Sequence, residues 1–498
     1  MNVNPITRLD YPDLDVIRVE DTYYMVSTTM HFMPGCEILQ SFDLVHWEHV
    51  TYVYETLDHT DAQQLKSGQN IYGQGMWAAS LRYHEGRFYI CFVANDTRKT
   101  YLYTSEKIDG PWKKQLIEGF YHDGSLLFDE DGRNYIVYGN DEIWITELNE
   151  DLTAPKKDGL HRLLVSDHKN PELGYEGSHI QKINGYYYIF LIHSLRDRWM
   201  RTEACFYSDS LEGEFTGGDV LCDDRGYCGQ GVAQGGIVDT PDGKWYAMLF
   251  QDSGAVGRLP ILLPVTWKDH FPVFGQNGHV PEEIEVHSTR PGYIYQPLVG
   301  SDDFCNGLLP RWQFNHDPDP RYYHLDALQG TYTITTREVC TELTQAVNTL
   351  TQRMSYPSCA AEVTVDASAL KEGDVAGLCA FQGCYAAVGI TKHHGKYEVL
   401  MLDKKEDGIL DMTEGTVVES HQMDFRLEAD FCNMKDEARC YYRVNKGDWL
   451  PIGTVHKLYF KLDHFTGCRF GLFCYAAEET GGSACFRDFK YYDVDEIS

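Results

Sequence analysis

Acidic residues recur at one position of a repeated pattern in the first half of the chain. Asp13, Asp123 and Glu176 each lie 11 or 12 residues before a Tyr that opens a short apolar run. Two carboxyl groups that flank a glycosidic bond can hydrolyse it, because one protonates the leaving oxygen while the other activates water or attacks the sugar carbon. A third carboxylate raises the pKa of the acid by adding a neighbouring negative charge. The three residues therefore predict glycoside hydrolysis if the fold brings them together.

The elements that must bring them together form a fivefold repeat of a turn, an aromatic-Tyr step and an apolar run. Intervals of 65, 46, 53 and 58 residues separate the anchors, which are Tyr24, Tyr89, Tyr135, Tyr188 and Tyr246. These intervals are close to what a four-stranded blade requires and predict a five-bladed β-propeller. The first strand of each blade lines the central channel, so residues at the start of these strands converge at one end of the axis.

The same register places Trp77 in the second copy and Gln234 in the fifth. The competing interpretation is that these carboxylates are not a functional site. Most of the 75 acidic residues must be solvated surface charges, and Asp is a common turn residue. Recurrence at one register in three copies favours a site. The pattern alone does not separate Asp13 from Asp15, which lies on the same face of the strand.

Composition narrows the class of protein. The chain has 498 residues and a net charge of −32, which argues against nucleic acid or an anionic membrane surface as partner. No apolar stretch is long enough to predict a membrane-spanning helix. The 15 cysteines form no CxxC pair, and the N-terminal residues do not resemble a secretion signal. We therefore expect free thiols and a cytoplasmic location.

Two domains are expected, and both are all-β. Residues 1–298 carry the repeat and are expected to form the propeller. A segment rich in Pro and Gly follows, and residues 299–498 then show short alternating strands such as TYTITT and AAEVTVDAS. Two antiparallel sheets that each bury one face account for this alternation, so the second domain is expected to be a β-sandwich.

Several motifs, taken in chain order, carry a resemblance to a known family. They are YPDLD, GMWAAS, HDGS, YEGSH and GRLP. Together they resemble glycoside hydrolase family 43, whose members are five-bladed propellers, often with a C-terminal β-sandwich. The resemblance covers nearly the whole chain. It implies an inverting, exo-acting hydrolase that releases terminal α-L-arabinofuranose or β-D-xylose from xylan or arabinoxylan oligosaccharides.

The resemblance also assigns roles to the three carboxyl groups. The Asp after Pro in YPDLD is the general base of the family, which selects Asp13 over Asp15. Glu176 of YEGSH corresponds to the general acid, and Asp123 of HDGS to the residue that tunes the pKa of the acid and orients the sugar. For inversion, the base and the acid are expected to lie about 6.5 to 9.5 Å apart.

Three further residues are substrate-binding candidates by the same resemblance. Trp77 would pack on the sugar ring, Arg258 would hydrogen-bond the terminal sugar, and Phe32 would wall the pocket. The competing interpretations are a core Trp, a rim ion pair and simple hydrophobic packing. Near the start of the second domain, Trp312 and His316 fit sandwich core as well as sugar contacts.

Gln234 departs from the family pattern, because many members carry at this position a His that holds an axial metal, usually calcium. A Gln oxygen is an acceptable calcium ligand, so a calcium here would be structural, and the chemistry itself needs no cofactor. His179 is a second candidate for lining the axial channel.

Two alternatives to the leading function remain. One is a retaining β-fructosidase, although its WMNDPNG and RDP motifs are missing. The other is a non-catalytic carbohydrate-binding propeller. The expected partner is a neutral oligosaccharide, and the sequence leaves open both arabinose against xylose and the oligomeric state.

Overall fold

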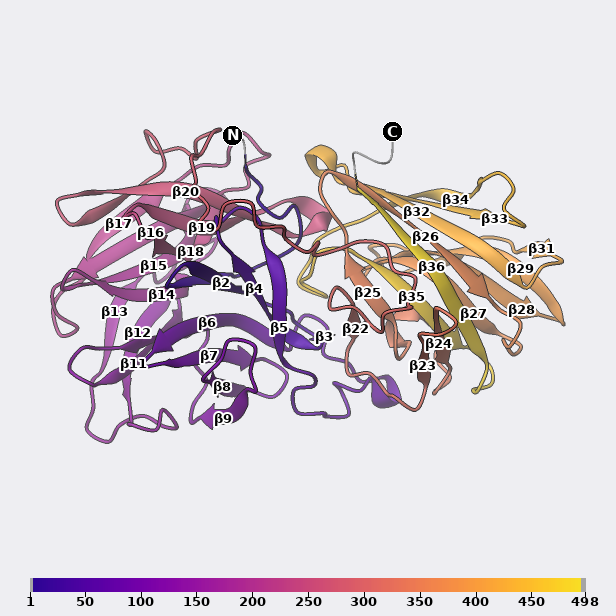
Figure 1. Cartoon of the computed structure of the whole chain (residues 1–498), viewed down its shortest axis with the longest axis horizontal. Coiled ribbons are helices and arrows are strands. Elements are labelled where there is room, and N and C mark those ends of the chain that lie inside the picture. Colours follow the sequence, from indigo (N-terminus) through magenta and orange to yellow (C-terminus); the bar gives the residue numbers. More distant parts are fainter. Residues whose placement is uncertain (1–2, 494–498) are drawn as a thin grey trace.

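The structure is a computed structural model that describes residues 3–493. Five four-stranded antiparallel sheets are arranged around an axis, and a domain of two larger sheets stands beside them (Figure 1). The prediction of an all-β chain with a five-bladed propeller followed by a β-sandwich is confirmed. None of the helices in the described range has the length and apolar character needed to cross a membrane.

Each blade is a meander of four consecutive sheet neighbours that runs from the axis outward. Blade 1 comprises β1 (Asp15–Val19), β2 (Thr22–Val26), β4 (Gly35–Ser41) and β5 (Glu48–Tyr54); blade 2, β6 (Met76–His84), β7 (Arg87–Ala94), β8 (Lys99–Ser105) and β9 (Lys113–Ile117); blade 3, β10 (Ser125–Phe128), β11 (Asn134–Asn140), β12 (Glu142–Leu148) and β13 (His161–Ser166); blade 4, β14 (Glu176–Ile183), β15 (Tyr186–Ser194), β16 (Arg201–Ser208) and β17 (Thr216–Leu221); blade 5, β18 (Val232–Asp239), β19 (Trp245–Asp252), β20 (Arg258–Lys268) and β21 (Phe271–Phe274).

The repeated aromatic-Tyr step forms the second strand of every blade. In blade 3, for example, Tyr135 pairs with Leu127 of the inner strand and is fully buried. Both residues belong to an apolar cluster that also contains Ile189 of blade 4. Each sheet packs against a neighbouring sheet on both faces, so both faces of its second strand are buried. The sequence of each second strand is therefore a continuous run of apolar residues. The repeat therefore encodes the packing between blades.

The ring closes between blades 5 and 1. The N-terminal segment runs along β20, where Ile6 N donates to Pro260 O at 3.0 Å and Asn4 Nδ2 to Leu262 O at 2.7 Å. Arg18, near the end of the inner strand β1, also forms an ion pair with Asp239 at the end of β18, the inner strand of blade 5. These bonds hold the first inner strand beside the last one.

The C-terminal domain has two sheets that face each other across a large apolar core. One sheet contains β3 (Phe32–Met33), β22 (Gln313–Asn315), β25 (Leu350–Arg353), β35 (Arg469–Ala476), β27 (Asp374–Phe381), β28 (Ala386–His393), β29 (Lys396–Lys404), β30 (Leu410–Met412) and β31 (Thr416–Val418); the other contains β23 (Tyr323–Asp326), β24 (Thr331–Thr335), β36 (Ser483–Asp493), β26 (Ser358–Asp366), β32 (Gln422–Asp430), β33 (Glu437–Arg443) and β34 (Leu450–Lys457). Four short 3-10 helices complete the described chain: η1 (Lys66–Gly68), η2 (Gly254–Val256), η3 (Leu343–Gln345) and η4 (Cys432–Met434).

One strand of this domain comes from the propeller sequence. β3 leaves blade 1 and pairs with β22, where Met33 lies opposite Phe314 and Phe32 opposite Asn315 (Figure 1). The two domains therefore share a sheet.

Candidate active site

Asp13, Asp123 and Glu176 converge at the end of the channel where the inner strands begin. Asp13 precedes β1, Asp123 precedes β10, and Glu176 is the first residue of β14. A small axial cavity is lined by Asp13 and Asp123 together with Gly177. The fold thus assembles the three carboxyl groups that the repeat predicted to meet.

The backbone at this end has an unusual conformation in all five blades. The residue four positions before the partner of each anchor Tyr has a left-handed φ, and these residues are Asp13 (51°), Ala78 (34°), Asp123 (47°), Gly177 (64°) and Gln234 (61°). Non-glycine residues held in this region cost about 1–3 kcal/mol each and cluster at functional sites. The repeat therefore places backbone strain around the axis.

The pairing also corrects the expected register for two residues. Trp77 and Glu176 lie one residue before the left-handed position, because the turns of blades 2 and 4 are one residue shorter than those of blades 3 and 5. Their structural counterpart in blade 3 is His122. Glu176 and His122 therefore approach each other from equivalent positions of adjacent blades.

Asp13 is held by two donors. Arg258 Nη1 donates to Oδ1 at 2.7 Å, and Thr28 Oγ1 donates to Oδ2 at 2.8 Å. Asp15, two residues later, is fully enclosed in an ion pair with Arg82 and a hydrogen bond with His179. Although burial opposes the shift, these two partners lower the pKa of Asp15 to about 2. The structure thus gives Asp15 a structural role and leaves Asp13 at the cavity.

His122 connects the other two carboxyl groups. Its Nε2 lies 3.6 Å from Asp123 Oδ2 and 3.5 Å from Glu176 Oε2. The backbone N–H of Gly177 donates to Asp123 at 2.9 Å, and Asn140 Nδ2 donates to Glu176 Oε2 at 2.8 Å. The imidazole and the two carboxyl groups therefore form one titrating cluster.

The proton distribution in this cluster follows from burial and charge. Burial, together with the charges of Glu176 and Asp13, raises the pKa of Asp123 to about 6 against the opposing effect of His122. Asp123 in turn raises the pKa of His122 to about 9, against its own burial. The pKa of Glu176 is lowered because His122, Arg201 and Arg258 outweigh its desolvation. These shifts favour a protonated His122 and an ionised Glu176.

Two buried guanidinium groups lie beside the carboxyl groups. Arg258 Nε contacts Asp252 Oδ1 at 3.2 Å, and Arg201 Nε contacts Asp252 Oδ2 at 2.9 Å. Phe250 and Phe465 sandwich the Arg258 guanidinium, at 4.8 and 4.3 Å from the ring centroids. Arg258 was expected either to hydrogen-bond the terminal sugar or to form an ion pair at the rim; it is instead buried in ion pairs with Asp13 and Asp252 beside the carboxyl groups.

The sandwich domain contributes one aromatic wall. Phe465 packs against Trp77 with ring centroids 5.4 Å apart. The loop that carries Phe465 is tied to the propeller, since Gly467 N donates to Asp10 at 2.8 Å and Cys468 N to Ala255 O at 2.8 Å. Within residues 3–493 the indole Nε1 of Trp77 is buried and has no hydrogen-bond partner, so it can donate to the oxygen of a ligand.

The comparisons with known proteins agree with this geometry. The model of "Glycosyl hydrolases family 43" matches residues 3–272, more than half of the chain. The chain belongs to this family. A second model, "Beta xylosidase C-terminal Concanavalin A-like domain", matches residues 301–492.

Individual members of family 43 resemble the chain over most of its length. A "Beta-xylosidase" of Formosa agariphila is 27% identical over 99% of this chain and 89% of its own length. A "Non-reducing end alpha-L-arabinofuranosidase" of Bacteroides ovatus is 24% identical, with coverage of 82% and 79%. A solved "Bifunctional GH43-CE" protein of Bacteroides eggerthii has a TM-score of 0.92 and 42% identity over 99% of this chain. This chain spans 63% of that protein's length.

Three residues that the sequence offered as sugar contacts lie outside the site formed by the carboxyl groups of this family 43 structure. They are Phe32, Trp312 and His316. Phe32 was expected to wall the pocket, but its ring is buried over the Arg469 guanidinium at 3.5 Å, because its segment joins the sandwich sheet as β3. Trp312 is sandwich core, and its indole donates to Asp302 at 2.8 Å. His316 is buried at the domain junction and accepts from Ile71 N at 2.9 Å.

The surroundings of Gln234 fit a water better than a calcium ion. Gln234 is buried at the axis beside Gly177, and the cavity there offers about 10 Å³ of space, enough for one water-sized occupant. Calcium takes six to eight oxygen ligands. His179, which also lines this cavity, is engaged by Asp15. The donors in this wall do not complete a calcium shell.

Sequence reasoning missed four residues of the site. His122 stands in the HDGS motif next to Asp123 and could have been found there. Arg201 and Asn140 lie at strand ends with no motif around them. Phe465 comes from the other domain, and its position depends on domain packing. The site as a whole brings three carboxyl groups, one imidazole and two guanidinium groups together at one end of the channel.

Proposed function

We propose that this family 43 glycosidase is an inverting, exo-acting enzyme that releases terminal pentoses, α-L-arabinofuranose or β-D-xylose, from xylan or arabinoxylan oligosaccharides. The observation that carries the proposal is that Asp13 and Glu176 both lie close enough to Asp123 to raise its pKa, at an end of the channel where the Phe465 loop of the second domain packs on Trp77. The names of the xylosidase and arabinofuranosidase relatives support the choice of pentoses.

In this mechanism Asp13 acts as the general base. Arg258 and Thr28 occupy one lone pair on each carboxylate oxygen and fix the orientation of the group. A water held against Asp13 loses a proton to it while the water oxygen attacks the anomeric carbon. The carbon inverts because the water arrives on the face opposite the leaving group.

Glu176 acts as the general acid and protonates the glycosidic oxygen as the bond to the anomeric carbon breaks. Because its lowered pKa favours the ionised carboxylate, Glu176 must first gain a proton. A sugar that displaces water around His122 and Glu176 raises the cost of the charged form of Glu176, so the proton of the cluster shifts toward the carboxyl group. The negative charge of Asp123 disfavours the ionised form of Glu176. The backbone N–H of Gly177 holds Asp123 in position, so that Asp123 can orient the sugar.

The exo action follows from the shape proposed for the site. Trp77 and Phe465, from different domains, wall one side, and Arg258 lies in the floor. A closed pocket of this kind accepts the end of a chain or a side branch more readily than the middle of a chain. The free indole N–H of Trp77 is available to a hydroxyl of the terminal sugar.

The test is hydrolysis of the two nitrophenyl pentosides and of an arabinosylated xylotriose. We expect release of a single pentose per event, an inverted product anomer by NMR at early times, and losses of at least about 10²-fold for Asp13→Ala and Glu176→Ala on the oligosaccharide. A retained anomer would contradict inversion. Binding of xylo-oligosaccharides without cleavage would instead identify a carbohydrate-binding propeller. The relative rates on the two pentosides decide between arabinose and xylose.

A further inference from the structure

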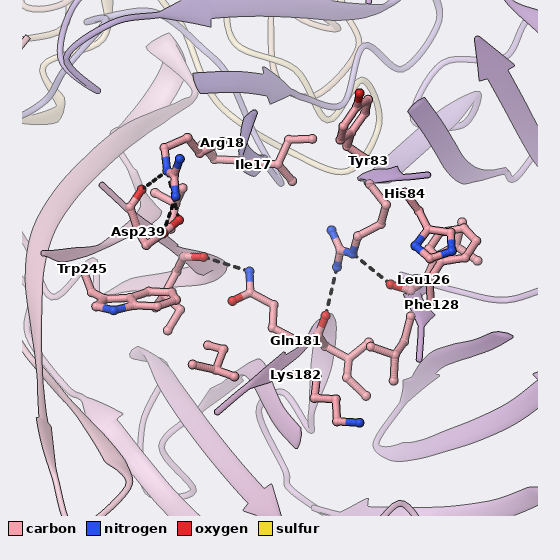
Figure 2. A pocket seen from close by; sticks show the side chains of 17 residues that line it. Ile17, Arg18, Tyr83, His84, Leu126, Phe128, Gln181, Lys182, Asp239 and Trp245 are labelled. Carbon is pink, nitrogen blue, oxygen red and sulfur yellow. Dashed lines mark hydrogen bonds and ion pairs between the residues drawn. The ribbon is translucent and has the colours of Figure 1, made fainter. Parts of the chain in front are cut away.

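A second cavity opens at the opposite end of the channel. It holds about 400 Å³, within the range of small-molecule sites, and all five blades line it. Its residues come from the far ends of the inner strands, such as Arg18, Arg82 and Lys182, whereas the catalytic carboxyl groups stand at the strand starts. Figure 2 shows the labelled side chains arranged around a central opening.

The cations of this cavity are already neutralised. Each Arg and Lys side chain in the wall is matched by a carboxylate within hydrogen-bond distance. The pairs are Arg18 with Asp239 at 2.5 Å, Arg82 with Asp15 at 2.7 Å, and Lys182 with Asp129 at 2.6 Å. A chain with a net charge of −32 adds no attraction for anions. The cavity therefore suits a neutral ligand.

The polar groups are nevertheless fixed in orientation and able to both donate and accept. Gln181 Nε2 donates to Ile237 O at 2.8 Å, which leaves the amide oxygen facing the opening toward Trp245 (Figure 2). Arg18 and Asp239 present a planar guanidinium and a carboxylate side by side. Hydroxyl groups, which donate and accept at once, match such a set.

Aromatic faces complete the wall. Trp245 is half-buried and is supported by an edge contact with Trp267 at 5.6 Å. Across the opening, His84 stacks on Phe128 with centroids 4.6 Å apart and an interplanar angle of 8°, and Tyr83 is 44% exposed. Flat apolar rings beside oriented polar groups bind molecules with one apolar face and polar edges, as sugar rings have.

We propose that this distal cavity is a second carbohydrate-binding site, which holds a neutral oligosaccharide segment away from the catalytic centre. Trp245 provides the stacking face, and Gln181 together with the pair of Arg18 and Asp239 binds the hydroxyl groups. The two ends of the channel are separated by the buried chain of Arg82, Asp15 and His179, so the distal site cannot deliver its sugar through the channel. Its use is to retain the enzyme on a polysaccharide.

The test is affinity electrophoresis of the inactive Glu176→Ala protein in gels that contain soluble arabinoxylan, a probe chosen on the basis of the proposed function. We expect arabinoxylan to retard this protein and Trp245→Ala, added to Glu176→Ala, to remove most of the retardation. Trp449→Ala is the matched control, because Trp449 is also half-buried, lies in the sandwich domain far from this cavity and packs on the guanidinium of Arg443. This control is expected to migrate like Glu176→Ala.

Kinetics on the active protein provide an independent readout. Trp245→Ala alone is expected to keep its kcat/KM on a nitrophenyl pentoside within about twofold, which also shows that it folds, and to lose about tenfold of its rate on dilute arabinoxylan. If Trp245→Ala fails to fold, Gln181→Ala takes its place in both measurements. Unchanged retardation and unchanged polymer rates in the folded variant would overturn the distal site. Retardation without pentoside hydrolysis by the wild type would overturn the proposed function and leave the distal site standing.

Discussion

Phe465 of the sandwich packs against Trp77 of blade 2, with ring centroids 5.4 Å apart, and also lies 4.3 Å from the guanidinium of Arg258. One side chain of the second domain thus contacts both aromatic and cationic parts of the sugar site. The active site is built by the two domains together.

Phe465→Ala is therefore expected to lower kcat/KM on pentosides by about 5- to 150-fold, because a ring contact and a cation–π contact are each worth about 0.5–1.5 kcal/mol. Leu462→Ala in the same loop is the control, since Leu462 is 71% exposed. Steady-state kinetics of the two purified variants measure the difference. Equal effects of both substitutions would mean that Phe465 acts only through the loop.

The roles of Glu176 and Asp123 can be distinguished by how the rate of each variant depends on the leaving group of the substrate. A general acid contributes about 10²–10⁴-fold when the leaving oxygen needs a proton, and little when it does not. We expect Glu176→Gln to lose at least about 100-fold on a xylo-oligosaccharide but much less on a dinitrophenyl pentoside. Asp123→Asn should lose similar factors on both substrates. If Asp123→Asn shows the leaving-group dependence instead, Asp123, whose pKa is raised to about 6, is the acid.

Asp123→Asn is also expected to stabilise the protein at neutral and alkaline pH. Burial raises the pKa of Asp123 from 3.8 to about 6, so the folded state favours its protonated form. Its favourable contribution is complete below the ordinary pKa and is lost as the pH rises through about 6. The gain in unfolding free energy should reach at most about 3 kcal/mol at pH 8 and vanish near pH 4. Denaturant unfolding at both pH values measures it, and an equal gain at both would contradict a charge effect.

Gly177→Ala is expected to destabilise the fold by at least about 2 kcal/mol and to reduce activity. A Cβ at this position would lie 2.7 Å from Gln234 Cγ, on a backbone with a φ of 64°. Displacement of Gly177 also moves the N–H that binds Asp123. Gly185→Ala in the hairpin of the same blade is the matched control. The φ of Gly185 is also positive, but a Cβ there would have no described atom within 4 Å outside the adjacent residues. The control should lose stability without losing activity.

Metal removal tests the axial cavity. Its small volume and engaged donors lead us to expect that EDTA changes the Tm of the protein by less than about 1 °C. A fall in Tm that calcium reverses in the wild type, but not in Gln234→Ala, would show that the axis holds calcium after all.

The fold could be predicted because the information is local and repeated. Each blade carries its own turn, its Tyr anchor and an apolar strand buried on both faces, as Tyr135 and Leu127 illustrate. The pairing of β3 with β22 could not be predicted, since a two-residue strand has no periodicity of its own. Because this pairing could not be foreseen from the sequence, Phe32 was assigned to the wall of the pocket.

The site was predicted as far as the repeat specifies it. Asp13 and Asp123 stand at the same left-handed position of their blades, and Glu176 one residue earlier. The proton balance depends on His122 and on two guanidinium groups brought from other strands, which spacing in the sequence does not reveal. Phe465 depends on how two domains meet.

The shared sheet has a consequence for the order of events during synthesis. Phe32 and Met33 are synthesised before the rest of the propeller, whereas their partners Phe314 and Asn315 follow it in the chain. The loop of blade 1 must therefore wait without its partner strand, and its last hydrogen bonds form only when the second domain arrives. The catalytic end of the propeller, where Phe465 packs on Trp77, would therefore mature only after the second domain has been synthesised.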